Sequence, residues 1–171
     1  MPEVEELGEG EPREVVLENA RRKARAVVSS APEGAVVLAA DTEVVLDGRV
    51  LGKAADEVSA RSHLEALSGR AHTVLGGLVV LGAGERGDEL AGVVASEVTF
   101  NRLEPATLDL YVASGEWRDR AGAYAIQGLG SILIDRMEGD FSNVVGLPVG
   151  LVLDLLPEGL FVPGRGRGVR N

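Results

Sequence analysis

Residues 36–53 read VVLAADTEVVLDGRVLGK, and the rest of the chain is organised around this stretch. The apolar run at 36–40 is continuous, which is typical of a strand buried on both faces. It ends at Asp41-Thr42, where a carboxyl and a hydroxyl group directly follow the apolar residues. The stretch therefore predicts a central strand that ends in polar side chains.

A hairpin is expected to bring the end of this stretch back toward its middle. Asp47-Gly48 lies between two apolar runs, and Asp-Gly favours a type I′ turn because both of its positions need a positive φ. Leu46 then pairs with Arg49, and the same register places Thr42 opposite Lys53. Facing side chains in such a pair lie about 4.5–5.5 Å apart at Cβ. The hairpin therefore predicts an ammonium group beside the end of the central strand.

The position of Asp41 leaves two interpretations open. Side chains alternate along a strand, so Asp41 would point away from the face that carries Thr42 and Lys53. We expect a bulge or the end of strand pairing to rotate Asp41 toward Lys53, which would build a polar site there. In the alternative interpretation, the stretch is a surface hairpin with an aspartate cap and a solvated lysine.

Composition narrows the class of protein. The chain has 171 residues, enough for one domain with a sizeable core, and it has no cysteine, which excludes disulfides and a cysteine nucleophile. Its formal net charge of −10 argues against a general nucleic-acid or membrane-surface binder. No apolar run is long enough to span a membrane and no leader opens the chain, so we expect a cytoplasmic location. His63 and His72 show no ligand spacing and are interpreted as structural or exposed.

Helices and strands are expected along the rest of the chain. Capping and turn residues place helices at 12–29, 56–68, 105–113 and 148–156. Apolar runs bounded by glycines place strands at 71–81, from after Gly84 to about Phe100, at 124–126 and at 131–135, of which the first two should pair antiparallel. Residues 1–157 are expected to form one domain, followed by a disordered Gly/Arg tail at 158–171.

Lys23 is a candidate site residue outside the central stretch. It lies on or beside the apolar face of the helix at 12–29, because Val16 and Ala20 recur at helical spacing. Its side chain either extends to water or reaches into a cleft to meet an anion. Lys23 and Lys53 are the only lysines among 17 basic residues. Unless they remain by chance, they mark positions that need a compact charge rather than a planar guanidinium.

Gln127 is a candidate for reading a base. It follows the short strand expected at 124–126 and precedes Gly128 and Gly130. Glycines let a ligand approach the backbone, and a Gln amide offers donors and an acceptor that suit the polar edge of a uracil or thymine ring. The alternative is a glycine turn after a strand with no ligand.

The combined pattern resembles the Maf family, nucleoside triphosphate pyrophosphatases also described as septum-formation proteins. The resemblance implies an α/β fold of the Maf/ITPase-like type, with a mixed twisted sheet, flanking helices and two lobes around a cleft. The matching pieces run in order over nearly the whole chain and are EE at 5–6, ARRKARAV at 20–27, AADT at 39–42, LDGRVLGK at 46–53, LSGRAHTV at 67–74, YVASGEW at 111–117, AGAYAIQGLG at 121–130 and FSNVVGLP at 141–148.

The resemblance also implies an activity and roles for named residues. The reaction is hydrolysis of a nucleoside triphosphate to the monophosphate and pyrophosphate. Asp41 matches the catalytic carboxylate of the family, a proton acceptor, and Lys23 and Lys53 match basic residues at the substrate phosphates. Thr42 and Gln127 match positions linked to base choice, in the form similar to the dTTP/UTP-cleaving branch. The branch that acts on 7-methyl-GTP carries an acidic residue where Gln127 stands.

A divalent cation and several partners follow from the same resemblance. Glu6 resembles the second acidic residue of the family, a metal partner, and the oxygen ligands of Asp41 and Glu6 suit Mg²⁺ or Mn²⁺. The expected partners are the nucleoside triphosphate and a second copy of the chain as a homodimer, with neither nucleic acid nor a membrane.

Two departures from the family stand out. The family opens with a strand and an S-x-S-P-R-R loop that helps to bind the triphosphate, and this sequence begins about where the family reaches its first acidic pair. A start codon placed too late, a fragment and a degenerate protein are the three interpretations, and the intact matches elsewhere favour the first. Glu43 stands where the family usually has an apolar residue, either near the metal or facing solvent.

Two other classes of function stay open from the sequence. One is a catalytically weakened nucleotide-binding or interaction protein that acts in cell division or septum formation. The other is an RNA-binding adaptor that uses the Arg-Gly residues at 164–171, for which RNA binding should weaken with salt.

Overall fold

The structure is a computed structural model that describes residues 10–82 and 89–156. Glu6, residues 83–88 and the tail at 158–171 lie outside the described residues. Within the described ranges, no helix combines the length and apolar character that crossing a bilayer requires.

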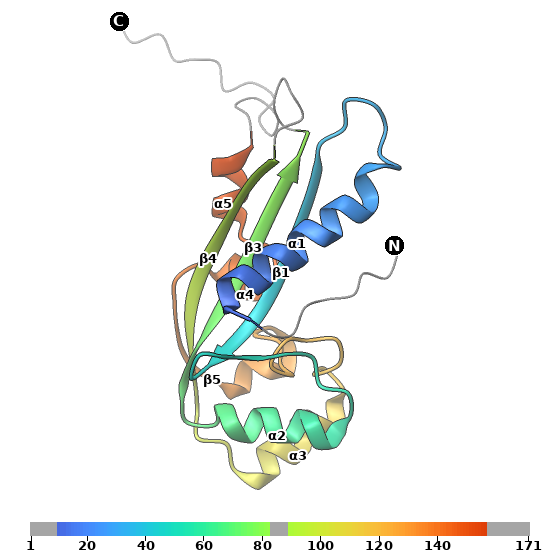
Figure 1. Ribbon diagram of the computed structural model, residues 1–171. Helices are drawn as coiled ribbons and strands as arrows, with labels where there is room; N and C mark the ends of the chain where they lie inside the picture. Colours follow the sequence, from blue (N-terminus) through green and yellow to red (C-terminus); the bar gives the residue numbers. More distant parts are fainter. Residues whose placement is uncertain (1–9, 83–88, 157–171) are drawn as a thin grey trace, which may run out of the picture.

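A five-stranded sheet forms the centre of the fold (Figure 1). Its strands lie in the order β2-β1-β3-β4-β5, and every pairing between these strands is antiparallel. The bounds are β1 Val37–Leu46, β2 Arg49–Leu51, β3 Ala71–Leu81, β4 Glu89–Phe100 and β5 Ile134–Glu138. The α/β fold class with flanking helices is confirmed, while the described strands show only antiparallel pairs instead of the mixed arrangement that the resemblance implied.

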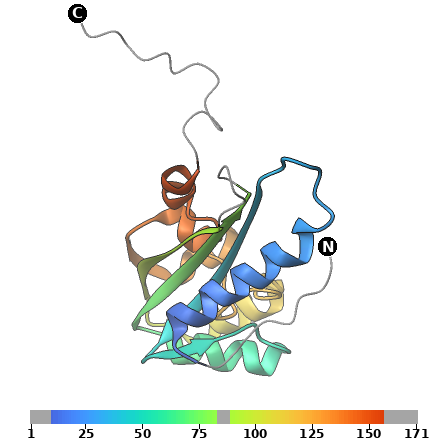
Figure 2. The same cartoon turned by 45° about the horizontal axis from the view of Figure 1, so that its top comes forward.

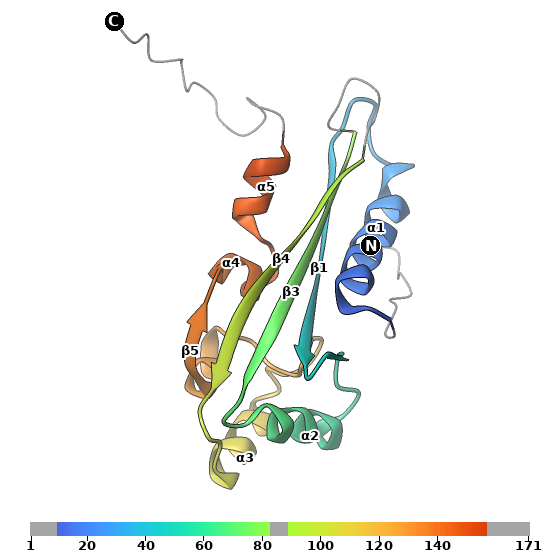
Figure 3. The same ribbon diagram turned by 60° about the vertical axis from the view of Figure 1, so that its left-hand side comes forward.

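Helices cover both faces and one end of the sheet. They are α1 Pro12–Val28, α2 Glu57–Leu67, α3 Pro105–Ser114, the 3₁₀ helix η1 Gly128–Leu133, α4 Phe141–Val145 and α5 Val149–Leu155. Figures 1 and 2 show α1 lying across one face, and Figure 3 shows α4 and α5 on the opposite face. The pair α2 and α3 closes the lower end of the sheet (Figure 1).

The helices begin where capping residues predict. The Glu11 side chain accepts hydrogen bonds from the first free amides of α1, and Pro12 starts the helix without needing a hydrogen-bond donor there. Asp56 and Ser59 form a reciprocal capping box at the start of α2. Gly115 ends α3 with a φ of 74°, a conformation that glycine adopts at little cost.

The hairpin at Asp47-Gly48 has the predicted register, but it is shorter than predicted. Leu46 pairs with Arg49, and the ladder ends at the pair Val44–Leu51. The prediction that Thr42 lies opposite Lys53 is therefore wrong. The chain turns away after β2, and Lys53 forms an isolated bridge with Ala121 instead.

The prediction of a strand at 124–126 is wrong, and the strand predicted at 131–135 is displaced toward the C-terminus as β5. Residues 124–126 form an irregular segment, and the chain then enters η1 before β5 begins at Ile134. The apolar residues of this region suggested strands, but glycine turns and contacts with α3 set its conformation. The short helix α4, capped by Asp140, was not predicted.

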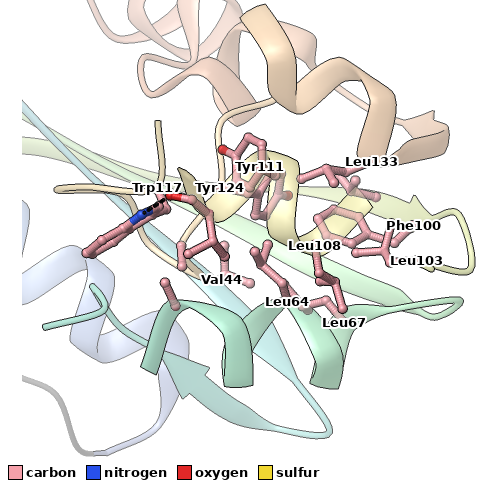
Figure 4. Packing of buried hydrophobic residues seen from close by; sticks show 14 of the residues in the cluster. Val44, Leu64, Leu67, Phe100, Leu103, Leu108, Tyr111, Trp117, Tyr124 and Leu133 are labelled. Carbon is pink, nitrogen blue, oxygen red and sulfur yellow. Dashed lines mark hydrogen bonds between the residues drawn. The ribbon is translucent and has the colours of Figure 1, made fainter. Parts of the chain in front are cut away.

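The largest apolar cluster lies at the end of the sheet that α2 and α3 cover (Figure 4). Leu64 and Leu67 of α2 and Tyr111 of α3 are completely buried there. The Trp117 indole donates a hydrogen bond to the Val112 carbonyl at 3.0 Å, which fixes the start of the segment that follows α3 (Figure 4). This cluster is therefore the base from which the segment at 115–130 extends.

His72 is a structural residue of this cluster, as predicted. It is 4% exposed, its Nε2 is 2.8 Å from the Tyr124 hydroxyl, and its ring meets Phe100 edge-on at 5.1 Å between centroids. Burial lowers the pKa of His72 from 6.5 to about 4, because the apolar surroundings disfavour the charged imidazolium.

Two glycines in the middle of β3 let helices approach both faces of the sheet. A Cβ on Gly77 would lie 2.6 Å from the Val16 carbonyl oxygen of α1. A Cβ on Gly76 would lie 1.9 Å from Oδ1 of Asn143 in α4, on the other face. The strand pairing sets these glycines opposite Asp41 and Thr42, so close approach of α1 and α4 happens beside the predicted site.

Gly77→Ala should destabilise the fold by about 2 kcal/mol, because the new methyl group forces the backbone of α1 away from β3. The free energy of unfolding from urea denaturation measures this loss. Gly52→Ala is the matched control, since no atom lies within 4 Å of a Cβ placed there. Equal stabilities of Gly77→Ala and Gly52→Ala would contradict the close packing.

His72 should make stability depend on pH. Above pH 6.5 the imidazole is neutral in both states, whereas between pH 6.5 and about 4 only the unfolded state binds the proton, so stability falls as pH falls. The wild type should lose about 3 kcal/mol more than His72→Gln over this window. Parallel pH profiles of the two proteins, measured by urea denaturation, would contradict the lowered pKa.

Candidate active site

A cavity of about 900 Å³ lies beside β1, beyond the point where β2 stops pairing. It is lined by parts of α1, β1, β2 and the residues after it, β3, the segment at 115–128 and the end of α4 with Gly146. Five of the six site residues predicted from the sequence line it, namely Lys23, Asp41, Thr42, Lys53 and Gln127. The sixth, Glu6, lies outside the described residues.

Asp41 contacts Lys23 on the face of the sheet that α1 covers. The carboxylate is buried, and the Lys23 ammonium donates a hydrogen bond to its Oδ1. Lys23 therefore points toward β1 and meets the carboxylate of Asp41, while its contact with a bound anion stays a prediction. The ion pair fixes the direction of the carboxylate, because a charge-assisted hydrogen bond is strong and directional.

No bulge rotates Asp41 toward Lys53, contrary to the prediction. The register between β1 and β3 is regular from Val37 to Val45, so Asp41 and Thr42 point to opposite faces of the sheet. The Thr42 hydroxyl lies toward Gly146, 3.9 Å from where a Cβ would stand on that glycine. Both residues reach the cavity because it extends around the edge of β1.

Lys53 is held at the cavity by the segment at 115–122. Its bridge to Ala121 is continued by Gly122, whose amide donates to the carbonyls of Leu51 at 2.7 Å and Gly52 at 3.1 Å. Gly122 also packs against Val44, since a Cβ there would lie 2.9 Å from that side chain. Contacts with this segment, rather than pairing with β1, therefore place Lys53 at the site.

Glu43 is buried. From the sequence, we expected it either near the metal or facing solvent. It is 7% exposed, lies on the same face of β1 as Asp41, and accepts a hydrogen bond from the buried Asn19 amide at 3.4 Å. Solvent exposure is therefore wrong. Asn19 lies one helical turn before Lys23, so two polar contacts tie α1 to β1 beside the cavity.

The lining of the cavity is less acidic than the chain as a whole. Its charged lining residues are four basic and four acidic side chains, Lys23, Lys53, Arg118, Arg120, Asp41, Glu43, Glu116 and Asp119. These charges balance, whereas the chain as a whole carries a formal net charge of −10, so basic residues are enriched here relative to the whole chain. Arg118, Arg120 and Glu116 were missed as site residues, although the charged run at 116–120 lies beside the glycine-rich segment that contains Gln127.

The described donors fit a hard divalent cation that shares its coordination with a ligand. In residues 10–82 and 89–156, no group of three or more His, Asp or Glu side chains could enclose a metal ion. The carboxylates of Asp41 and Glu43 nevertheless line the cavity from one face of β1. Mg²⁺ is commonly bound by one or two carboxylates together with substrate phosphates, so this donor set suits it.

Comparison with known proteins agrees with the matched motifs and their spacing. The family model described as "Maf-like protein" matches residues 1–159. A protein named dTTP/UTP pyrophosphatase from Anaeromyxobacter dehalogenans is 53% identical over 146 residues, covering 85% of this chain and 73% of the relative. Proteins of the same name from Pyrococcus abyssi and Caldanaerobacter subterraneus are 44% and 42% identical, covering 86% and 97% of this chain and 77% and 80% of their own lengths. The chain belongs to the Maf family.

Proposed function

We propose that this chain hydrolyses nucleoside triphosphates, preferably dTTP and UTP, to the monophosphate and pyrophosphate. The observation that supports this most is the single cavity lined by Lys23, Asp41, Thr42, Lys53 and Gln127 in a member of the Maf family. Its volume of about 900 Å³ falls within the range of small-molecule sites, about 300–1,000 Å³. The relatives that carry the name dTTP/UTP pyrophosphatase cover most of the chain.

Asp41 is the proposed catalytic base. It would orient a water molecule for attack on the α-phosphorus and accept its proton, since its carboxylate lies in the cavity in a fixed direction. Lys23 would hold that direction and face the phosphates with its remaining donors. Lys53, which lines the same cavity, would neutralise charge that develops on the leaving pyrophosphate.

The proposed cofactor is Mg²⁺ or Mn²⁺, held by Asp41 and Glu6 together with phosphate oxygens. When bound, it would neutralise phosphate charge and polarise the reacting phosphorus centre. The buried Glu43 lies beside Asp41 on the same face and adds negative charge that favours a cation at this place.

Gln127 and Thr42 are the proposed residues for base selection. A uracil or thymine ring presents a carbonyl acceptor next to an N–H donor, and a glutamine amide offers the complementary donor and acceptor. Gln127 is exposed at the cavity, and Thr42 adds a hydroxyl from the face of the sheet near Gly146. Adenine presents the reverse order of donor and acceptor, and guanine, which shares the carbonyl and N–H, differs by its larger two-ring size.

Asp41→Asn should lower kcat for pyrophosphate release by at least about 10²-fold, because an amide cannot accept the proton of the attacking water. Pyrophosphate release from UTP measures the loss, and circular dichroism checks the fold. Asp47→Asn is the control, because the same change is made at the exposed hairpin turn, outside the cavity. Unchanged turnover in a folded Asp41→Asn protein would refute the assignment.

UTP and dTTP should be cleaved with a kcat/KM at least about tenfold above that for GTP and ATP, which corresponds to one well-made hydrogen bond. Gln127→Ala should reduce this preference while leaving circular dichroism unchanged. Equal kcat/KM values for all four nucleotides in the wild type would remove Gln127 and Thr42 from base selection.

A further inference from the structure

The helix η1, which follows Gln127, is capped by a residue from another segment. Gln127 occupies the N-cap position, yet its side chain makes no capping hydrogen bond. Glu116 does this instead, since its Oε1 and Oε2 accept hydrogen bonds from the amides of Leu129 and Gly130, each at 3.2 Å. The first amides of a helix have no partner within it, so a carboxylate there is stabilising. The Gln127 side chain is therefore not needed for capping.

The turn around Gln127 fits closely onto this carboxylate. A Cβ on Gly128 would lie 2.9 Å from Oε1 and 3.0 Å from Oε2 of Glu116, and the φ of Gly128 is +66°. A Cβ on Gly130 would lie 1.9 Å from the Ala125 carbonyl oxygen. Gly128 and Gly130, both after Gln127, thus allow the backbone to close against Glu116 and Ala125, and the conformation of Gln127 depends on these contacts.

The end of α3 holds both ends of the turn. The Tyr111 hydroxyl accepts a hydrogen bond from the Ala125 amide at 3.0 Å, two residues before Gln127. The Glu116 amide donates to Ser114 Oγ at 3.2 Å, and Ser114 Oγ donates to the Tyr111 carbonyl at 2.6 Å. Tyr111 is completely buried, so this chain of contacts links the backbone around Gln127 to the apolar core.

We propose that Glu116 is a positioning residue for base selection, which fixes the backbone of Gln127 so that its amide faces the pyrimidine ring. This inference rests on the proposed function, because it names how the same site chooses its base. Uracil and cytosine differ in the direction of two hydrogen bonds on one edge of the ring. An amide can distinguish them only if its donor and acceptor keep their places, since hydrogen bonds weaken steeply when distance or angle is lost.

The experiment compares UTP with CTP in a double-mutant cycle of Glu116→Gln and Gln127→Ala. Glutamine keeps the size of Glu116, but its amide nitrogen cannot accept a hydrogen bond from a backbone amide. Each single variant should reduce the ratio of kcat/KM for UTP over CTP by about tenfold, which is the loss of one good hydrogen bond. The double variant should show no further reduction, because Glu116 acts on the base through Gln127.

Asp56→Asn is the matched control, since Asp56 also caps a helix, accepting from the Ser59 amide at 2.7 Å, and does not line the cavity. The ratio of kcat/KM for UTP over CTP in Asp56→Asn should equal that of the wild type. If Glu116→Gln does not fold, Tyr111→Phe loosens the other end of the turn and should also lower the ratio. An unchanged ratio in a folded variant, equal losses for UTP and CTP, or additive losses in the double variant would each overturn the inference.

Binding separates this inference from the proposed function. Calorimetry with α,β-imido analogues of UTP and CTP gives the same ratio from dissociation constants without turnover. A wild type that selects the UTP analogue through Glu116 but releases no pyrophosphate would overturn the proposed function alone. If the wild type is active and Glu116→Gln has the same ratio for UTP over CTP, the inference alone is overturned. A wild type that neither binds nor hydrolyses these nucleotides would overturn both.

Discussion

The close approach of two helices to opposite faces of β3 is the constraint on which the site depends. Gly77 lets the backbone of α1 contact one face, and Gly76 lets Asn143 of α4 contact the other. These glycines pair with Asp41 and Thr42 on the neighbouring strand. The same two contacts therefore bring α1, with Lys23, and the residues after α4 to the edge of β1. Side chains larger than hydrogen would hold both helices away from the cavity.

The cavity exists because the edge of β1 is only partly covered by the short strand β2. Because side chains alternate along β1, Asp41 points to one face of the sheet and Thr42 to the other. Both residues line the cavity at this edge. Gln127 reaches the cavity from the segment after α3, which the buried Trp117 and Tyr111 attach to the core, and Lys53, after β2, bridges to Ala121 of the same segment. Rigid elements thus support residues that come from four separate parts of the chain.

The sequence predicted most of the elements correctly where local chemistry decides them. Proline and acidic caps start α1 and α2, and Asp47-Gly48 sets the hairpin register. The prediction of a strand at 124–126 is wrong, and the strand predicted at 131–135 is displaced, because the conformation of this region depends on contacts with Glu116 and Tyr111. No local sequence pattern reveals these contacts. Local patterns already singled out Asp41, Lys53, Lys23 and Gln127, and the family resemblance gave them roles. Glu116, Arg118 and Arg120 were recognised only from the lining of the cavity.

The sequence by itself determined the family, the candidate residues Asp41, Lys23, Lys53, Thr42 and Gln127, and most of the helices and strands. Motif spacing, periodicity and turn chemistry are local properties, so they can be read along the chain. Only the tertiary structure decided that Lys23 meets Asp41, that Lys53 bridges to Ala121 and that Glu43 is buried. These outcomes depend on which faces pack together, and packing is settled by contacts between segments distant in the sequence.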